Sequence, residues 1–257
     1  MKKLIVLTSI ILFFSCSEEK TNEPITISPE ELHASVDKVT EIMIHDIFSP
    51  PVASRIFAYP NIAAYEIIAL NNPEYISLAT QVTDLTAIPN PKDEASINYQ
   101  MAALVAHLEL SKRLIFSEKR METLRDSLYG NWQAKNETVF KASEEYGLQV
   151  ADHIGEWMNK DNYNQTRTMP KFTVNMDDAT RWQPTPPAYM EGIEPHWSKI
   201  RPFVIDSAEQ FKPTPPPAFS MEEGSDFYKE LKEVYDISNQ ITKDGDTSEE
   251  VEIAQFW

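Results

Sequence analysis

Histidine is the side chain most often used for metal binding and proton transfer, and the five histidines of this sequence show no motif for either role. They are His33, His45, His107, His153 and His196. None belongs to an HExxH arrangement, in which two histidines one helical turn apart would bind zinc. The sequence therefore gives no support for a zinc hydrolase.

Two kinds of environment are expected for these histidines. Glu41 and His45 are four residues apart, so they share one face of a helix. We expect that face to be a solvent-exposed stripe rather than a ligand pair. His107 and His153 lie among apolar helical positions, and we expect them to be histidines in or beside the core.

Nucleophilic catalysis has no more support than metal binding. The sequence contains no GxSxG elbow, and its only cysteine, Cys16, lies in the leader. Acidic side chains are abundant, but no carboxylate pair stands out. Glycosidase chemistry is therefore unsupported.

A proline-rich strap, Pro195–Pro217, holds the best candidates for binding an anion. It reads PHWSKIRPFVIDSAEQFKPTPPP and includes His196, Lys199 and Arg201. Proline fixes φ and lacks an N–H, so the strap is expected to be irregular. For Lys199 and Arg201 we favour a surface or helix-capping role over a site.

The strap resembles a segment of the bacterial vanadium-dependent haloperoxidase-like proteins, which share a superfamily with the type 2 phosphatidic acid phosphatases. The resemblance rests on His196-Trp197, KIRPF, Gln210-Phe211 and the prolines that follow. Two other stretches fit the same family, SPPVASRIFAYPNIAAYE from Ser49 and EIAQFW at Glu252–Trp257. The resemblance implies a helical fold.

The resemblance also implies a site for vanadate or phosphate, which needs several cations and an apical histidine. In the family these residues come as K-x6-R-P, P-S-G-H and S-R-x5-H. Arg201-Pro202 is the only Arg-Pro pair, but Glu194 occupies the lysine position. Ser54-Arg55 is the only Ser-Arg pair, and Asn61 stands where the histidine would be. We therefore expect no catalytic, cofactor-binding or metal-binding residue in this chain, and vanadate only in a full-length protein.

These observations lead to the hypothesis that the chain is the N-terminal half of a haloperoxidase-like protein. Its partner would be a missing C-terminal catalytic half, and the chain by itself would be inactive. An acid phosphatase of the same superfamily is one alternative. The other is a surface glycan-binding lipoprotein, in which exposed tryptophans would stack on sugar rings. The candidates for that role are Trp132, Trp157, Trp182 and Trp197.

Residues 1–16 have the pattern of a lipoprotein signal peptide. Lys2 and Lys3 precede a short apolar run, and Ser15-Cys16 resembles the end of a lipobox. We expect lipidation of Cys16, which would anchor the protein in the cell envelope, most simply at the outer membrane. A polar tether, residues 17–27, would follow.

The elements that must position these residues are helices. Apolar residues recur at helical spacing over about 29–47, 52–70, 93–115, 118–128 and 137–159, and capping signals at Ser220 and Thr247 predict two more helices. The fold class is therefore all-α. We expect three regions. The first, 28–159, is helical. The second, 160–220, is an irregular strap region that includes Pro195–Pro217 and holds 10 of the 18 prolines, and the third, 221–257, contains two helices. The formal net charge of −17 argues against nucleic acid as a partner.

Overall fold

The computed structural model describes residues 22–244 and 248–256, and within them every regular element is a helix. The all-α prediction is confirmed for this part of the chain. The α-helices are α1 (Pro29–His45), α2 (Pro50–Asn71), α3 (Tyr99–Lys112), α4 (Glu118–Lys135), α5 (Glu137–Met158), α6 (Tyr163–Thr166), α7 (Asp226–Asp244) and α8 (Glu249–Phe256). Short 3-10 turns are η1 (Leu78–Thr80), η2 (Glu94–Ser96) and η3 (Trp197–Lys199).

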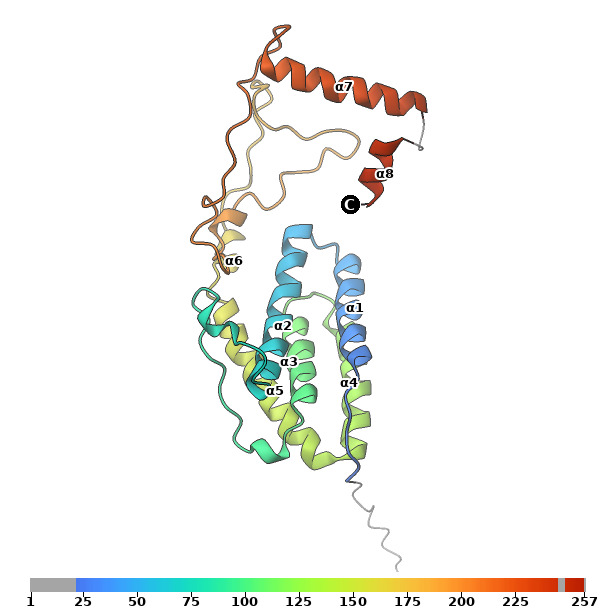
Figure 1. Cartoon of the computed structure of the whole chain (residues 1–257), viewed down its shortest axis with the longest axis vertical. Coiled ribbons are helices and arrows are strands. Elements are labelled where there is room, and N and C mark those ends of the chain that lie inside the picture. Colours follow the sequence, from blue (N-terminus) through green and yellow to red (C-terminus); the bar gives the residue numbers. More distant parts are fainter. Residues whose placement is uncertain (1–21, 245–247, 257) are drawn as a thin grey trace, which may run out of the picture. The chain divides into compact units, whose positions relative to one another are not determined.

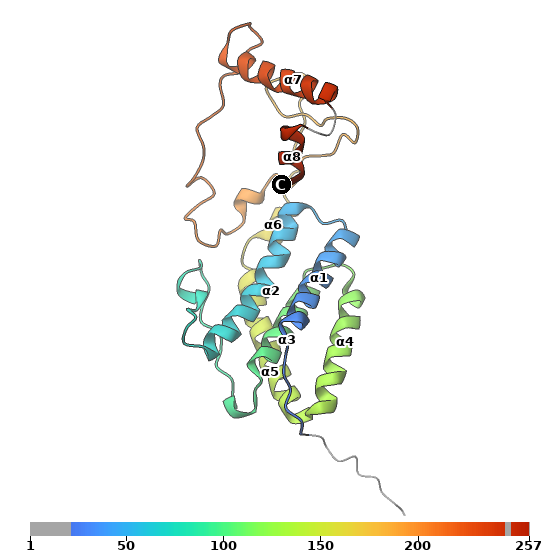
Figure 2. The ribbon, with the colours of Figure 1, turned by 45° about the vertical axis from the view of Figure 1, so that its right-hand side comes forward.

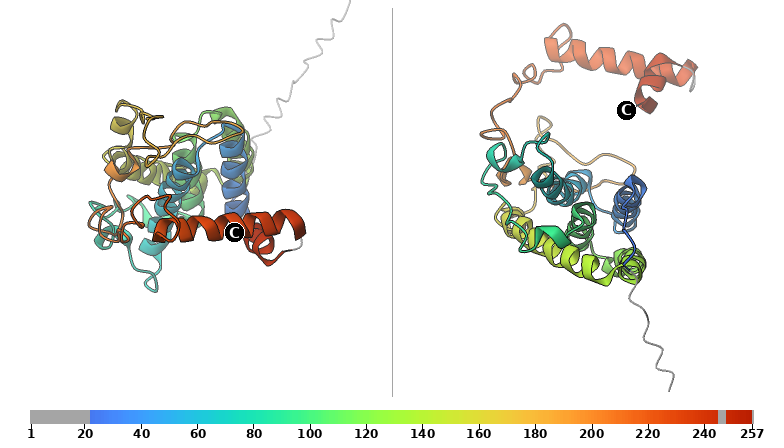
Figure 3. Two further views of the ribbon diagram at one scale, coloured as in Figure 1. Left: turned by 90° about the horizontal axis from the view of Figure 1, so that it is seen from above. Right: turned by 60° about the horizontal axis from the view of Figure 1, so that its bottom comes forward.

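The chain divides into two units, and the first contains residues 22–169 together with His196–Val204. Its helices α1 to α5 lie side by side (Figures 1 and 3). Helix α3 is central, because it contacts α1, α2, α4 and α5. Every residue from Met101 to Ser111 of α3 is buried. A helix that is buried on all sides is typical of the middle of a bundle.

Helix α5 approaches α3 closely at Gly147. A Cβ atom placed on this glycine would lie 2.6 Å from the carbonyl oxygen of Ala102 and 2.7 Å from Val105. Only a residue without a side chain allows this distance, so Gly147 sets the contact between the two central helices.

Local capping explains where the helices begin. At α1 a capping box is present, and the backbone N–H of Ser28 donates to Glu31 Oε2 at 2.8 Å. Helix α3 was expected from residue 93, but it begins after Asn98, whose side chain accepts from the N–H of Met101. The residues before it form the η2 turn instead.

The start of α7 also differs from the prediction. Ser220 Oγ accepts from the N–H of Glu222 within a turn, and Gly224 then adopts a φ of +92°, which breaks a helix at that point. The helix begins after Ser225, whose Oγ accepts from the N–H of Tyr228 at 3.2 Å. Ser225, rather than Ser220, is therefore the cap.

The second unit contains residues 170–195 and the described part of 205–257. It consists of helices α7 and α8 and of long irregular segments (Figure 2). None of its described residues is buried. It therefore has no hydrophobic core of its own.

The predicted signal peptide and Cys16 lie outside the described residues. Within the described ranges, no helix has the length and apolar composition needed to cross a membrane.

Candidate functional site

The inner part of the strap, His196–Val204, is anchored in the first unit by stacked aromatic rings. The ring of Phe203 stacks on Trp157 and meets Tyr59 edge-on, with both centroid distances at 5.5 Å. Tyr59 and Trp157 are themselves in edge contact at 5.1 Å. The carbonyl oxygen of Phe203 also accepts from the N–H of Thr83 at 2.8 Å. Three segments far apart in sequence are thus joined at one residue.

A buried carboxylate, Asp161, lies beside these rings. It accepts hydrogen bonds from Arg55 Nε at 2.7 Å, from the Tyr59 hydroxyl at 2.8 Å and from the N–H of Tyr163 at 2.8 Å. The Asp161 side chain is 1% exposed and that of Arg55 is 7% exposed. Because water hardly reaches either side chain, each charge is compensated by the other.

The same arrangement acts on Tyr59. Burial and the neighbouring Asp161 carboxylate raise the pKa of Tyr59, so its hydroxyl stays protonated and donates to Asp161. Tyr59 serves this cluster as a hydrogen-bond donor rather than as a base.

Arg201 holds the end of helix α5. Its guanidinium lies 4.5 Å from the centre of the Trp157 ring, and Nη2 donates to the Trp157 carbonyl oxygen at 3.1 Å. Its backbone N–H donates to the carbonyl oxygen of Asp161 at 2.9 Å. A cation is favourable at a helix C-terminus. The predicted helix-capping role is confirmed for Arg201, and Lys199 is exposed, as predicted.

The pairing of Arg55 with Asp161 was not predicted. The two residues are 106 positions apart, and no motif links them. One signal was present in the sequence: Arg55 occupies the same face of α2 as Val52, Ile56 and Tyr59. A charged residue on an apolar face requires a buried partner.

His107 is the core histidine that the sequence predicts. It is 2% exposed, and its Nδ1 lies 2.8 Å from Ser35 Oγ. Burial lowers its pKa from 6.5 to about 4, so the ring is neutral at pH 7. By contrast, Glu41 and His45 are exposed, and Glu41 pairs with Lys38 and Arg120.

The two arginines of the family-like segments, Arg55 and Arg201, are both engaged by other groups of the first unit. The equatorial oxygens of vanadate require several cations that converge on one point, with a histidine at the apex. Arg55 is paired with Asp161, and Arg201 is stacked on Trp157. Across residues 22–244 and 248–256, no three His, Cys, Asp or Glu side chains are grouped to hold a metal ion.

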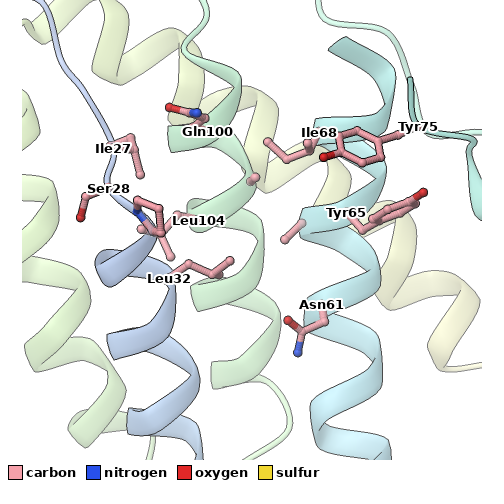
Figure 4. Close-up of a pocket in the computed structure, with 12 residues that line it drawn as sticks. Ile27, Ser28, Leu32, Asn61, Tyr65, Ile68, Tyr75, Gln100 and Leu104 are labelled. Atoms are coloured by element: carbon pink, nitrogen blue, oxygen red, sulfur yellow. The ribbon is translucent and has the colours of Figure 1, made fainter. Parts of the chain in front are cut away.

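A separate apolar groove of about 720 Å³ lies where α1 and α2 diverge, with α3 beneath it (Figure 4). Its lining is Ile27, Ser28, Pro29, Leu32, Asn61, Ala64, Tyr65, Ile68, Tyr75, Gln100, Ala103 and Leu104. No lining residue is charged. The groove therefore suits apolar groups and not a halide, a phosphate or vanadate.

The four tryptophans considered for sugar stacking occupy different environments. Trp132 is 2% exposed and Trp157 is 5% exposed, so both belong to the core. Trp197 packs against one of the core clusters. Only Trp182 is half exposed; it meets the edge of Phe172 in a loop cavity of about 580 Å³ within the second unit.

Comparison with known proteins identifies the fold. No protein-family model matches the chain, and no curated protein gives a significant match. A crystal structure described as that of the first bacterial vanadium-dependent iodoperoxidase is 73% identical in sequence, with a TM-score of 0.89. The match covers 92% of this chain and 57% of that chain.

The chain belongs to the bacterial vanadium-dependent haloperoxidase-like proteins. The resemblance seen in the strap and in the segment that contains Arg55 is thereby confirmed, and so is the helical haloperoxidase-like fold. The chain spans somewhat more than half the length of its iodoperoxidase relative.

Proposed function

We propose that this chain is the helical N-terminal part of a vanadium-dependent haloperoxidase, an enzyme that oxidises halide with hydrogen peroxide. The observation that carries the proposal is the 73% identity to a bacterial iodoperoxidase over 92% of the chain. The relative's activity makes iodide the halide of choice. At this identity, the packing of α1 to α5 and the anchoring of the strap are those of a haloperoxidase scaffold.

The proposal assigns vanadate and the catalytic residues to a part of the enzyme that this chain does not span. Two candidate cations of this chain are engaged elsewhere, Arg55 by Asp161 and Arg201 at the end of α5. The role of this chain is then to form the surface against which the catalytic part packs. By itself the chain is proposed to be inactive.

A chimera provides the test. This chain would replace the matching part of the iodoperoxidase, and peroxide-dependent iodide oxidation would be measured with and without added vanadate. We expect vanadate-dependent activity in the chimera and none in the 257-residue chain. The unmatched part of the iodoperoxidase, expressed by itself, is the control.

Two results would contradict the proposal. One is a folded chimera that oxidises no iodide. The other is an activity that does not depend on vanadate.

The leader adds a location to this proposal. Lipidation of Cys16 would hold the enzyme at the cell envelope, in agreement with the apolar run that precedes it. Metabolic labelling with a clickable palmitate analogue tests this idea. The label should appear on the wild-type protein and be absent from Cys16→Ser; label on both proteins would exclude Cys16 as the attachment site.

A further inference from the structure

Helix α7 has a broad apolar stripe that the described residues of its own unit leave largely uncovered, although Phe227 at its start contacts the ring of Phe219. Phe227, Leu231, Val234 and Ile241 recur at helical spacing and so lie on one face. Leu231 is 41% exposed and Val234 is 66% exposed. Tyr235 and Ile237, beside this stripe, are 62% and 39% exposed.

A helix of this kind needs a surface to pack against. Most helical stability in proteins comes from packing of the apolar face rather than from the helix alone. Helix α7 has 19 residues, and the unit that contains it buries none of its described residues. The stabilising surface must therefore come from outside the unit.

We propose that the apolar stripe of α7 is the docking surface for an amphipathic helix in the part of the haloperoxidase that this chain does not span. The inference rests on the proposed function. The relative's chain is long enough to supply such a helix, since the match covers only 57% of it.

The charges along α7 indicate the chemistry of the partner helix. Glu230 and Glu233 border the stripe on one side, and the whole chain carries a formal charge of −17. A partner with lysine or arginine at the facing edge would complement this border. A second copy of the chain fits less well, because an antiparallel pair of α7 helices would bring the same acidic borders together.

Hydrogen exchange of the α7 amides in the 257-residue chain and in the iodoperoxidase chimera tests the proposal. We expect α7 to exchange at least about tenfold more slowly in the chimera, because docking must precede protection. Val234→Glu, on the stripe, should remove this protection. Asn239→Glu adds the same charge on the polar side of α7 and should leave it in place.

Protection of α3 and α5 in each variant serves as the folding control, and it should not change. The proposal is overturned if α7 is equally protected in the isolated, monomeric chain, or if Val234→Glu leaves the protection intact. Protection that appears in the isolated chain only at high concentration would assign the stripe to a second copy, which also overturns it.

The outcome can be separated from that of the proposed function. A chimera with vanadate-dependent iodide oxidation but an unprotected α7 rejects only the docking surface. An inactive chimera with a protected α7 rejects only the function.

Discussion

The two units of this chain use the same amphipathic pattern with opposite results. In the first unit, Leu110 and Ile154 are completely buried, because α3 and α5 cover each other. In the second unit, Val234 and Leu231 of α7 are 66% and 41% exposed. Periodicity shows that a helix has a face to cover, but it does not show what covers it. The difference teaches that the first unit has a hydrophobic core of its own, whereas the described residues of the second unit form none.

The strap extends this comparison within a single proline-rich segment. Phe203 and Arg201 are fixed by aromatic stacking and hydrogen bonds in the first unit. Phe211, in the part of the strap that belongs to the second unit, is 75% exposed. What distinguishes the two parts is the presence of Trp157 and Asp161 beside the first, not a difference in proline content.

The largest effect is expected at the buried ion pair of the first unit. Asp161→Asn leaves Arg55 buried without a counter-charge and should cost about 3–5 kcal/mol of the free energy of unfolding. Urea denaturation followed by circular dichroism measures it. Asp152→Asn is the control, since its pair with Arg113 is exposed and worth about 0–1 kcal/mol. Equal losses in the free energy of unfolding for the two variants would show that burial of the Arg55–Asp161 pair does not make it more important than an exposed pair.

A matched pair of truncations compares the two units directly. Leu110→Ala removes a completely buried side chain and should lower the free energy of unfolding by about 2–5 kcal/mol. Leu231→Ala in the isolated chain should change it by less than about 0.5 kcal/mol, because that side chain is 41% exposed. A large loss at Leu231 in the isolated chain would show that the second unit has a core after all.

Acid should weaken the first unit through His107. Its pKa in the folded protein is about 4, below the ordinary value of 6.5, because burial disfavours the charged ring. The unfolded chain therefore binds more protons between these values, so stability is complete above pH 6.5 and falls as the pH drops toward 4. The total loss is about 3 kcal/mol.

The pH dependence can be isolated by comparing two proteins. The free energy of unfolding would be measured across this range for the wild type and for His107→Leu, in which carboxylates titrate as before. The wild type should show the steeper decline between pH 6.5 and 4. Identical slopes would remove His107 as the cause.

The smallest effects come from two glycines of the first unit. Gly147→Ala forces α5 away from α3 and should cost about 1–3 kcal/mol. Gly130→Ala, within α4, meets no atom within 4 Å and should stabilise by about 0.5–1 kcal/mol. Thermal unfolding of both variants measures the difference. A shift of the melting temperature in the same direction for both variants would contradict the close approach of α5 to α3 at Gly147.

The sequence was sufficient for features decided by neighbouring residues. The capping box at Ser28 and Glu31, and the extent of α5, follow from local patterns and are present in the structure. The start of α7 was misplaced because the backbone at Gly224 overrides a valid capping pattern at Ser220. A positive φ cannot be read from composition, since glycine is also compatible with helix.

Sites formed by residues far apart in the sequence were harder to predict. Arg201 was assigned correctly to a capping role, because the spacing required for an anion site was missing. The carboxylate that pairs with Arg55 could not be named, because many acidic residues are available and only the fold selects Asp161. Long-range pairing is decided by packing, and packing leaves no local pattern in the chain.

The anchoring of Phe203 has a consequence for the order of folding. Its hydrogen bond to Thr83 closes a loop of 120 residues, and closing so long a loop is entropically unfavourable until the helices are in place. We therefore expect the strap to dock after α1 to α5 have packed, so the face of Trp157 that Phe203 covers stays open to solvent until that step.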